Sequence, residues 1–268
     1  MWPVLFNFGP FGLKTIAVFN ILAFLTTAFV IWRKSREEHY QERQLFDGFL
    51  LALVFGGLVA RLAFIVVNFS RFQGSFLAWF DLINHSGYLL NFGILGAGFY
   101  LFRFAQKHKW DPYEVVDFGA TAAALGLFWL QLGYFFNGSG FGQPTTLPWG
   151  LVFPGVIQKY HPVQLYLAVF YLLLYFYLTW VEYRYRTFEW YRAGKKSAQT
   201  GFVFLNFLIG LALIQLGLTP VKLAELNLGG FSLDIGFYLV LLILSLGWLW
   251  LRSGRELLPT KRKKLNVK

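Results

Sequence analysis

Apolar residues gather in seven long runs along the chain, and shorter stretches between the runs hold most of the charge. The runs span residues 12–32, 46–68, 87–105, 114–136, 161–180, 201–219 and 234–251. A helix that rises 1.5 Å per residue crosses a hydrocarbon layer of about 30 Å with about 20 residues. Strands of a membrane β-barrel would instead alternate apolar and polar positions over about ten residues. The pattern therefore predicts an all-α integral membrane protein with seven transmembrane helices.

The composition agrees with this class of protein. Hydrophobic residues make up 57% of the chain and charged residues only 14%, whereas soluble domains are about 25% charged. The chain has no cysteine, which excludes disulfides, thiolate metal sites and a cysteine nucleophile. Its four histidines are far apart in sequence, so neither a metal site nor a cofactor is predicted. We predict a single polytopic membrane domain over residues 1–268, with the first run retained as a span, because the first eleven residues carry no Lys or Arg.

Basic residues alternate between the connections and predict an orientation. Segments 33–45, 106–113 and 181–200 and the tail 252–268 hold most of the Lys and Arg residues. The other connections hold only Arg71, Lys159 and Lys222. Basic loops stay in the cytoplasm, so we expect the N-terminus outside, the C-terminus in the cytoplasm and the 137–160 loop outside.

The net charge of +11 admits two kinds of partner, nucleic acid or anionic lipid. No folded nucleic-acid-binding module accompanies the basic tail. We therefore predict that the tail 252–268 touches the anionic inner leaflet, and that the partner is the bilayer and not nucleic acid. The aromatic segment 71–86 is predicted to lie in the interface at the outer face.

Polar residues inside the spans recur at a similar predicted depth, toward the outside. These residues are Asn91, Gln131, Asn137, Gln164, Tyr166 and Gln215. Polar groups are costly in lipid, so their positions are informative. They either line one polar cavity or form hydrogen bonds between helices worth about 1 kcal/mol each. Gly56 and Gly57 in the second span are predicted to permit close helix contact.

Two titratable or charged residues lie at the same depth. Arg61 follows Asp47 by fourteen residues, or about 21 Å along a helix. Its guanidinium is always charged and needs a partner, either a lipid phosphate or an acid such as Asp234. His161 is a candidate general base, a hydrogen-bond donor or a helix cap. At a spacing of three residues, His161 and Gln164 are expected to share a helix face.

Several motifs in this order resemble one family. They are Gly9-Pro10, the segment GGLVARL at 56–62, the glycine and asparagine positions between 133 and 142, Pro148-Trp149-Gly150, Phe153-Pro154 and HPVQLY at 161–166. Together they resemble the prolipoprotein diacylglyceryl transferases. The resemblance implies a multi-pass protein of the bacterial cytoplasmic membrane. It also implies transfer of a diacylglyceryl group from phosphatidylglycerol to the lipobox cysteine in a prolipoprotein signal segment.

The chain departs from the family pattern at several functional positions. Gln131 stands where the family signature has arginine, Tyr134 where it has asparagine and Ser139 where it has glutamate. Asn91-Phe92-Gly93 replaces a His-Gly-Gly block, and Gln215 with apolar neighbours replaces a late arginine and glutamate. The replacements of arginine and histidine remove cationic donors that the family applies to its substrates.

The resemblance also implies a chemistry. A thiol with a pKa near 8.5 needs a base or a positive field to become a thiolate, and departing glycerol phosphate needs cationic donors. By resemblance, Arg61 binds the lipid phosphate and His161 is the candidate base. Each lost donor costs a few kcal/mol, so two functions stay open. One is a transferase with a reduced site; the other is a non-catalytic membrane protein that binds lipid or lipoprotein signal segments. A small transporter is less favoured, because no inverted repeat is evident.

Overall fold

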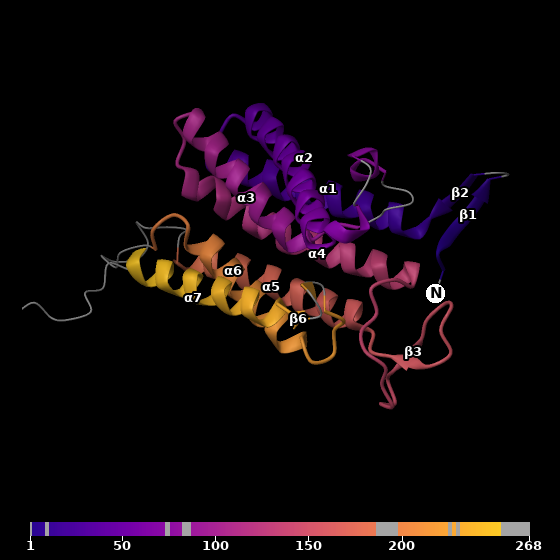
Figure 1. The fold of residues 1–268 in the computed structure, drawn as a ribbon. Coiled ribbons are helices and arrows are strands. Elements are labelled where there is room, and N and C mark those ends of the chain that lie inside the picture. The colour runs from indigo at the N-terminus through magenta and orange to yellow at the C-terminus, as the bar shows by residue number, and fades with distance from the viewer. Residues whose placement is uncertain are drawn as a thin grey trace, which may run out of the picture.

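The computed structural model describes residues 2–8, 11–72, 76–81, 87–185, 198–224, 227–228 and 231–252, and these form a helical bundle (Figure 1). The described residues contain seven α-helices, one for each predicted apolar run: α1 (Thr15–Glu37), α2 (Glu42–Val67), α3 (Leu90–Lys107), α4 (Pro112–Asn137), α5 (Val163–Tyr185), α6 (Phe202–Leu218) and α7 (Asp234–Arg252). Five of them, α1, α2, α4, α5 and α7, are long and apolar enough to cross a membrane. The helical architecture is thus confirmed.

Short extended elements gather at one end of the bundle. Antiparallel strands pair β1 (Val4–Phe8) with β2 (Phe11–Lys14), β3 (Leu151–Val152) with β4 (Lys159–Tyr160), and β5 (Asn227–Leu228) with β6 (Phe231–Ser232). The 3₁₀ helices η1 (Phe69–Arg71) and η2 (Phe76–Trp79) follow α2. We call this the hairpin end; α1, α3, α5 and α7 begin there. The predicted first span is therefore wrong at its start, because residues 12–14 pair with β1 instead of beginning the helix.

Some predicted segments fall partly or wholly beyond the described residues. The basic tail is described only at Arg252, and the Gly9-Pro10 motif lies outside the described ranges. Of the predicted interfacial segment 71–86, the structure describes residues 71–72 and 76–81.

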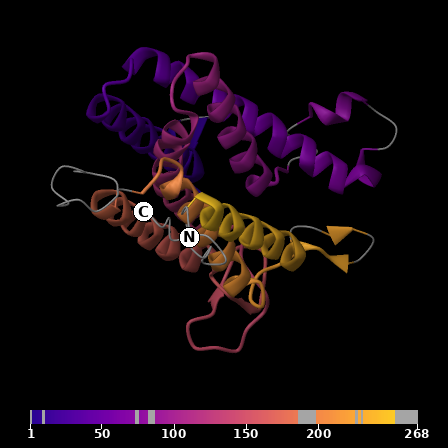
Figure 2. The ribbon, with the colours of Figure 1, turned by 90° about the vertical axis from the view of Figure 1, so that its left-hand side faces the viewer.

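Helix α4 is the central helix of the bundle. Helices α1, α2 and α3 lie on one side of it and α5, α6 and α7 on the other (Figures 1 and 2). The side chain of Asp111 caps its start by accepting from the Tyr113 N–H at 2.9 Å, and Pro112 takes the first helical position. It ends at Gly138, which adopts the left-handed conformation with φ of 76°. This central position brings α4 side chains to both halves of the bundle.

A buried carboxylate joins the two halves at the end opposite the hairpins. Asp117 of α4 is 1% exposed, and its Oδ1 and Oδ2 accept from the backbone N–H groups of Phe204 at 2.7 Å and Gly201 at 2.8 Å. Unpaired N–H groups at a helix start need acceptors, and a carboxylate also complements the helix dipole. Asp117 therefore fixes the start of α6 against α4.

Helices α2 and α3 approach closely through small residues. A Cβ placed on Gly56 would lie 2.7 Å from the Gly93 carbonyl oxygen, and one placed on Gly93 would lie 3.0 Å from Ala60 Cβ. The predicted close contact at Gly56 is thus confirmed. At Gly57 it is wrong, since a Cβ there meets no atom within 4 Å because the position turns away from α3.

Candidate functional site: an apolar cavity beneath a polar layer

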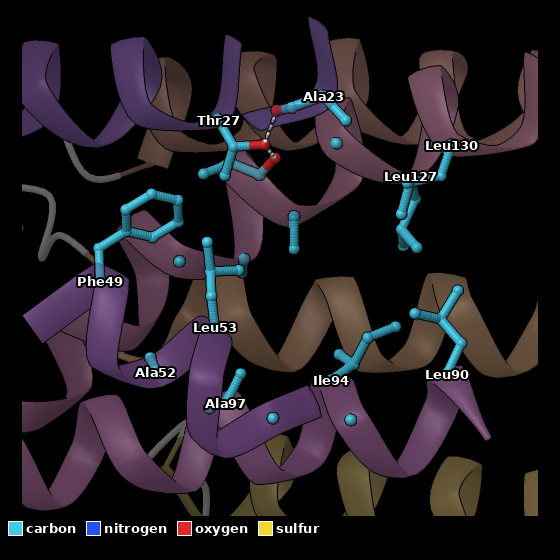
Figure 3. A pocket seen from close by; sticks show the side chains of 18 of the residues that line it. Ala23, Thr27, Phe49, Ala52, Leu53, Leu90, Ile94, Ala97, Leu127 and Leu130 are labelled. Carbon is cyan, nitrogen blue, oxygen red and sulfur yellow. Dashed lines mark hydrogen bonds between the residues drawn. The ribbon is translucent and has the colours of Figure 1, made fainter. Parts of the chain in front are cut away.

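A cavity of about 580 Å³ lies between α1, α2, α3 and α4, with Phe204 and Phe207 of α6 closing one side. Its walls are mainly glycine, alanine and aliphatic side chains. Figure 3 shows Leu90 and Ile94 of α3 opposite Leu127 on α4. The glycine and alanine residues create the volume of the cavity, and the aliphatic side chains make its surface apolar. Such an interior suits hydrocarbon better than a polar ligand.

Few polar groups reach the cavity wall. The Thr27 hydroxyl donates to the Ala23 carbonyl oxygen of its own helix at 2.6 Å and also lies 3.5 Å from the Ala122 carbonyl oxygen of α4 (Figure 3). Tyr88 and Tyr134 line the cavity toward the hairpin end. Polarity at the wall is therefore concentrated near one end.

The cavity reaches the protein surface between α1 and α2. Four of its lining residues are exposed there: Asn20 and Phe24 on α1, and Leu53 and Gly57 on α2. Phe24 is 38% exposed and Leu53 is 44% exposed. The cavity is therefore open on the α1–α2 side of the bundle.

Two of the predicted amides tie helices together near the hairpin end. Asn91 at the start of α3 donates from Nδ2 to the Tyr238 hydroxyl of α7 at 2.6 Å. Gln215 of α6 donates from Nε2 to the Tyr171 hydroxyl of α5 at 2.8 Å, and its Oε1 accepts from Lys222 Nζ at 2.9 Å. Asn91 and Gln215 are both buried. Both amides therefore form hydrogen bonds between helices, which was the alternative to lining a polar cavity.

A second group surrounds the turn after α4. Gln164, 1% exposed, donates from Nε2 to the Ser139 carbonyl oxygen at 2.7 Å, and Asn137 Nδ2 donates to Ser139 Oγ at 3.0 Å. A Cβ placed on Gly140 would lie 3.8 Å from Gln164 Cγ and 4.0 Å from Tyr134 Cβ. Because Tyr134 lines the cavity, this turn and Gln164 lie beside the cavity's hairpin end.

Gln131 is buried on α4, one residue beyond the lining residue Leu130. The side chain of Gln131 has no hydrogen bond to another described residue, and Gln164 Oε1 is fully buried without a partner among the described residues. Buried amide groups normally have partners, and an unpaired one costs about 1–3 kcal/mol. Within the described part of the protein, some hydrogen-bonding groups near the cavity therefore have no partner.

His161 precedes α5 and does not lie inside it. Its N–H donates to the Gln143 carbonyl oxygen at 3.0 Å, and its carbonyl oxygen accepts from the Gly142 N–H at 2.9 Å. The expectation of a helix face shared with Gln164 is thus wrong, because the following Pro162 favours an extended conformation at His161. The ring Nδ1 lies 3.4 Å from the Tyr166 hydroxyl, so these two predicted site residues do meet.

Arg61 is 7% exposed and turns toward the segment after α2. Its guanidinium donates four hydrogen bonds at 3.1–3.4 Å to backbone carbonyl oxygens, those of Ala78, Trp79, Asp81 and Gly87. The rings of Phe64, Phe72 and Tyr88 lie 5.3–5.9 Å from its guanidinium carbon. Arg61 therefore holds residues 78–81 and Gly87 against α2, and its role at a lipid phosphate stays a prediction.

Sequence reasoning missed three participants in this layer. Tyr171 and Tyr238 are buried tyrosines whose hydroxyls meet predicted amides, and Lys222 reaches Gln215 from beyond α6. One signal was available for Tyr171, since it follows Gln164 by seven residues, or about two turns on one helix face. In the described part of the chain, no three His, Cys, Asp or Glu side chains gather as a metal site.

The long apolar helices define a multi-pass membrane protein, and its bundle encloses an apolar cavity. The family model for prolipoprotein diacylglyceryl transferase matches residues 3–251. This chain belongs to that family, which confirms the resemblance in its motifs.

Curated relatives agree with this assignment along most of the chain. The phosphatidylglycerol–prolipoprotein diacylglyceryl transferase of Nitratidesulfovibrio vulgaris is 28% identical over 258 residues, covering 94% of this chain and 93% of the relative. The same-named protein of Legionella pneumophila strain Corby is 29% identical over 258 residues, covering 92% and 95%. That of Clostridium tetani is 27% identical over 217 residues, covering 78% and 80%.

Proposed function

We propose that this protein transfers a diacylglyceryl group from phosphatidylglycerol to the cysteine thiol of a prolipoprotein signal segment. Family membership over nearly the whole chain supports the reaction. The cavity carries the proposal structurally, because its volume lies within the usual range of about 300–1,000 Å³ for ligand pockets and its wall is apolar. A thioether bond forms at the glyceryl carbon as the carbon–oxygen bond to phosphate breaks. Glycerol phosphate leaves with the electron pair.

The proposal places the hairpin end outside the bacterial cytoplasmic membrane, with all seven helices spanning it. Support comes from the opposite end, where the last turn of α1 carries Lys34 and Arg36, and the end of α3 with the α3–α4 connection carries Lys107 and Lys109. Exported prolipoproteins would then meet the cavity's hairpin end, where Tyr88 and Tyr134 lie.

In this arrangement the acyl chains enter between α1 and α2 and occupy the cavity. The headgroup lies at the hairpin end, beside Gln131, Asn137 and Gln164. His161 is the proposed base that takes the thiol proton, and its contact with Tyr166 sets the position of its ring. Binding inside a preformed cavity supplies the proximity on which a two-substrate reaction depends.

One observation favours a second function, non-catalytic binding of lipid or of lipoprotein signal segments. The family's charged positions are neutral here at Gln131, Ser139 and Gln215. In addition, the Arg61 guanidinium donates to backbone carbonyl oxygens of four described residues. Loss of preorganised cationic donors lowers transfer rates by orders of magnitude while apolar binding persists.

A transfer assay decides between the two functions. The purified protein in mixed micelles is incubated with a lipobox peptide and phosphatidylglycerol labelled in its acyl chains. We expect label on the peptide cysteine, and no label on a Cys→Ser peptide. Folded protein that binds phosphatidylglycerol yet leaves the peptide unlabelled would establish the non-catalytic function instead.

A matched pair of variants tests the cavity. Ile94→Trp fills space inside it, whereas Val54→Trp adds the same ring at a position of α2 that is 62% exposed. We expect Ile94→Trp to lower lipid binding and transfer and Val54→Trp to retain both. Equal behaviour of the two folded variants would remove the cavity from the proposal.

A further inference from the structure

Lys222 lies just beyond the end of α6, half-buried among polar groups. Its Nζ donates to Gln215 Oε1 at 2.9 Å, and Gln215 in turn donates to the Tyr171 hydroxyl at 2.8 Å. Gln215 is 3% exposed and Tyr171 is 1% exposed. The ammonium group is therefore directed back onto a buried polar pair instead of extending into water.

The backbone beside Lys222 is fixed to the loop that holds His161. Gln143 donates from its N–H to the Val221 carbonyl oxygen at 2.8 Å and from Nε2 to the Lys222 carbonyl oxygen at 3.3 Å. The Gln143 carbonyl oxygen accepts from the His161 N–H. A Cβ placed on Gly142 would lie 2.1 Å from the Val221 carbonyl oxygen and 3.2 Å from His161 Cβ. Residues 142–143 thus hold His161 and the Lys222 segment on their two sides.

Gln215 lies beyond the cavity along α6. Gln215 follows the lining residue Phe204 by eleven residues, which is about three helical turns and about 16 Å. The two residues therefore share a helix face, with Gln215 nearer the hairpin end. A lipid whose chains fill the cavity would carry its headgroup toward Gln215 and Lys222.

Three other cations near the hairpin end are placed differently. Lys14 and Lys159 are exposed, and the Arg61 guanidinium is engaged by carbonyl oxygens. An ammonium group is a compact charge with three N–H donors, which suits a phosphate oxygen. Lys222 brings such a charge to a site where Gln215 is neutral.

We propose that Lys222, positioned by Gln215, forms an anion-binding site for the phosphate of the lipid headgroup. The inference rests on the proposed function for its role in transfer. As the carbon–oxygen bond breaks, negative charge develops on the departing phosphate, and the ammonium stabilises it. Positive charge near the thiol also favours the thiolate that attacks.

The test compares Lys222→Met, which keeps the side-chain length and removes the charge, with Lys222→Arg. Lys159→Met is the matched control, because it removes an exposed lysine from the same end of the bundle. Binding is measured in nanodiscs that contain phosphatidylglycerol in phosphatidylcholine, with thermal unfolding as the check of folding. We expect about tenfold weaker phosphatidylglycerol binding for Lys222→Met, the loss of one charge-assisted contact. Lys222→Arg and Lys159→Met should stay close to the original protein.

Two further arms identify the anion and separate the inference from the proposed function. Soluble glycerol phosphate and inorganic phosphate are titrated as competitors of phosphatidylglycerol binding. If either competes in the original protein but not in Lys222→Met, the site binds free anions. If neither competes while lipid binding still depends on Lys222, the site binds the lipid headgroup. If the original protein transfers no label while Lys222→Met still loses phosphatidylglycerol binding, the anion site stands and the transferase function fails. Folded Lys222→Met that binds like the original protein, or a loss equal to that of Lys159→Met, overturns the inference.

Discussion

Replacement of Gly56 by alanine tests the helix contact that builds one wall of the cavity. The added Cβ would lie 2.7 Å from the Gly93 carbonyl oxygen and 3.0 Å from Ala97 Cβ. The first of these neighbours is backbone, so relief requires α2 and α3 to separate. Gly57→Ala is the control one residue along, because its Cβ meets no atom within 4 Å.

The two substitutions should change stability in opposite directions. Overpacking of a close contact costs about 1–3 kcal/mol. An alanine in open space instead gains up to about 1 kcal/mol of helix propensity over glycine. We therefore expect the free energies of unfolding of the two variants to differ by about 2 kcal/mol or more, with Gly56→Ala the less stable.

Equilibrium unfolding in mixed micelles, followed by tryptophan fluorescence against an increasing fraction of denaturing detergent, measures this difference. Lipid binding by each folded variant gives a second readout, since separation of α2 and α3 changes the cavity wall. Equal midpoints for Gly56→Ala and Gly57→Ala would show that the helices do not meet at Gly56 and would refute the reasoning.

Three other substitutions test contacts outside the cavity. Arg61→Met removes the hydrogen bonds to residues 78–81, so cleavage of that segment in limited proteolysis should speed up at least about tenfold, the effect of losing one charged hydrogen bond, and unchanged cleavage would contradict the contact. Asp117→Asn replaces an acceptor with a donor opposite a buried N–H and should cost about 1–3 kcal/mol in thermal unfolding; a neutral effect would contradict the α6 cap. Burial and the hydrogen bond to Glu114 raise the pKa of the Tyr40 hydroxyl, so its contribution is full below pH about 10 and is lost as the pH rises further. Tyr40→Phe should remove this alkaline loss of stability, and an unchanged pH profile would contradict it.

Helices were predictable here because lipid-length apolar runs have few alternatives. The residues at which the helices begin were harder to predict. The strand β2 (Phe11–Lys14) continues directly into α1, and its apolar residues extend the same run, so hydropathy alone cannot separate strand from helix. Pro162 gave a local signal that His161 precedes α5, because the residue before proline avoids helical conformations.

Sequence placed the polar residues near one end of the bundle but could not pair them. Arg61 was predicted at the right end, yet its partners are carbonyls of a segment that starts seventeen residues later, at Ala78. Every residue has a backbone carbonyl, so the residue types do not reveal which carbonyls act as acceptors. Gln215 was read as a lost charge, and only the fold shows that Lys222 returns an ammonium group to its amide.

The most direct test of the cavity as the lipid site is photo-crosslinking with phosphatidylglycerol that carries a diazirine near the end of one acyl chain. Adducts located by mass spectrometry should fall on lining residues such as Leu53, Ile94 and Leu127. Excess unlabelled phosphatidylglycerol should suppress them. Adducts confined to lipid-facing positions such as Ile243 and Leu244 of α7, which are 65% and 64% exposed, would contradict the account.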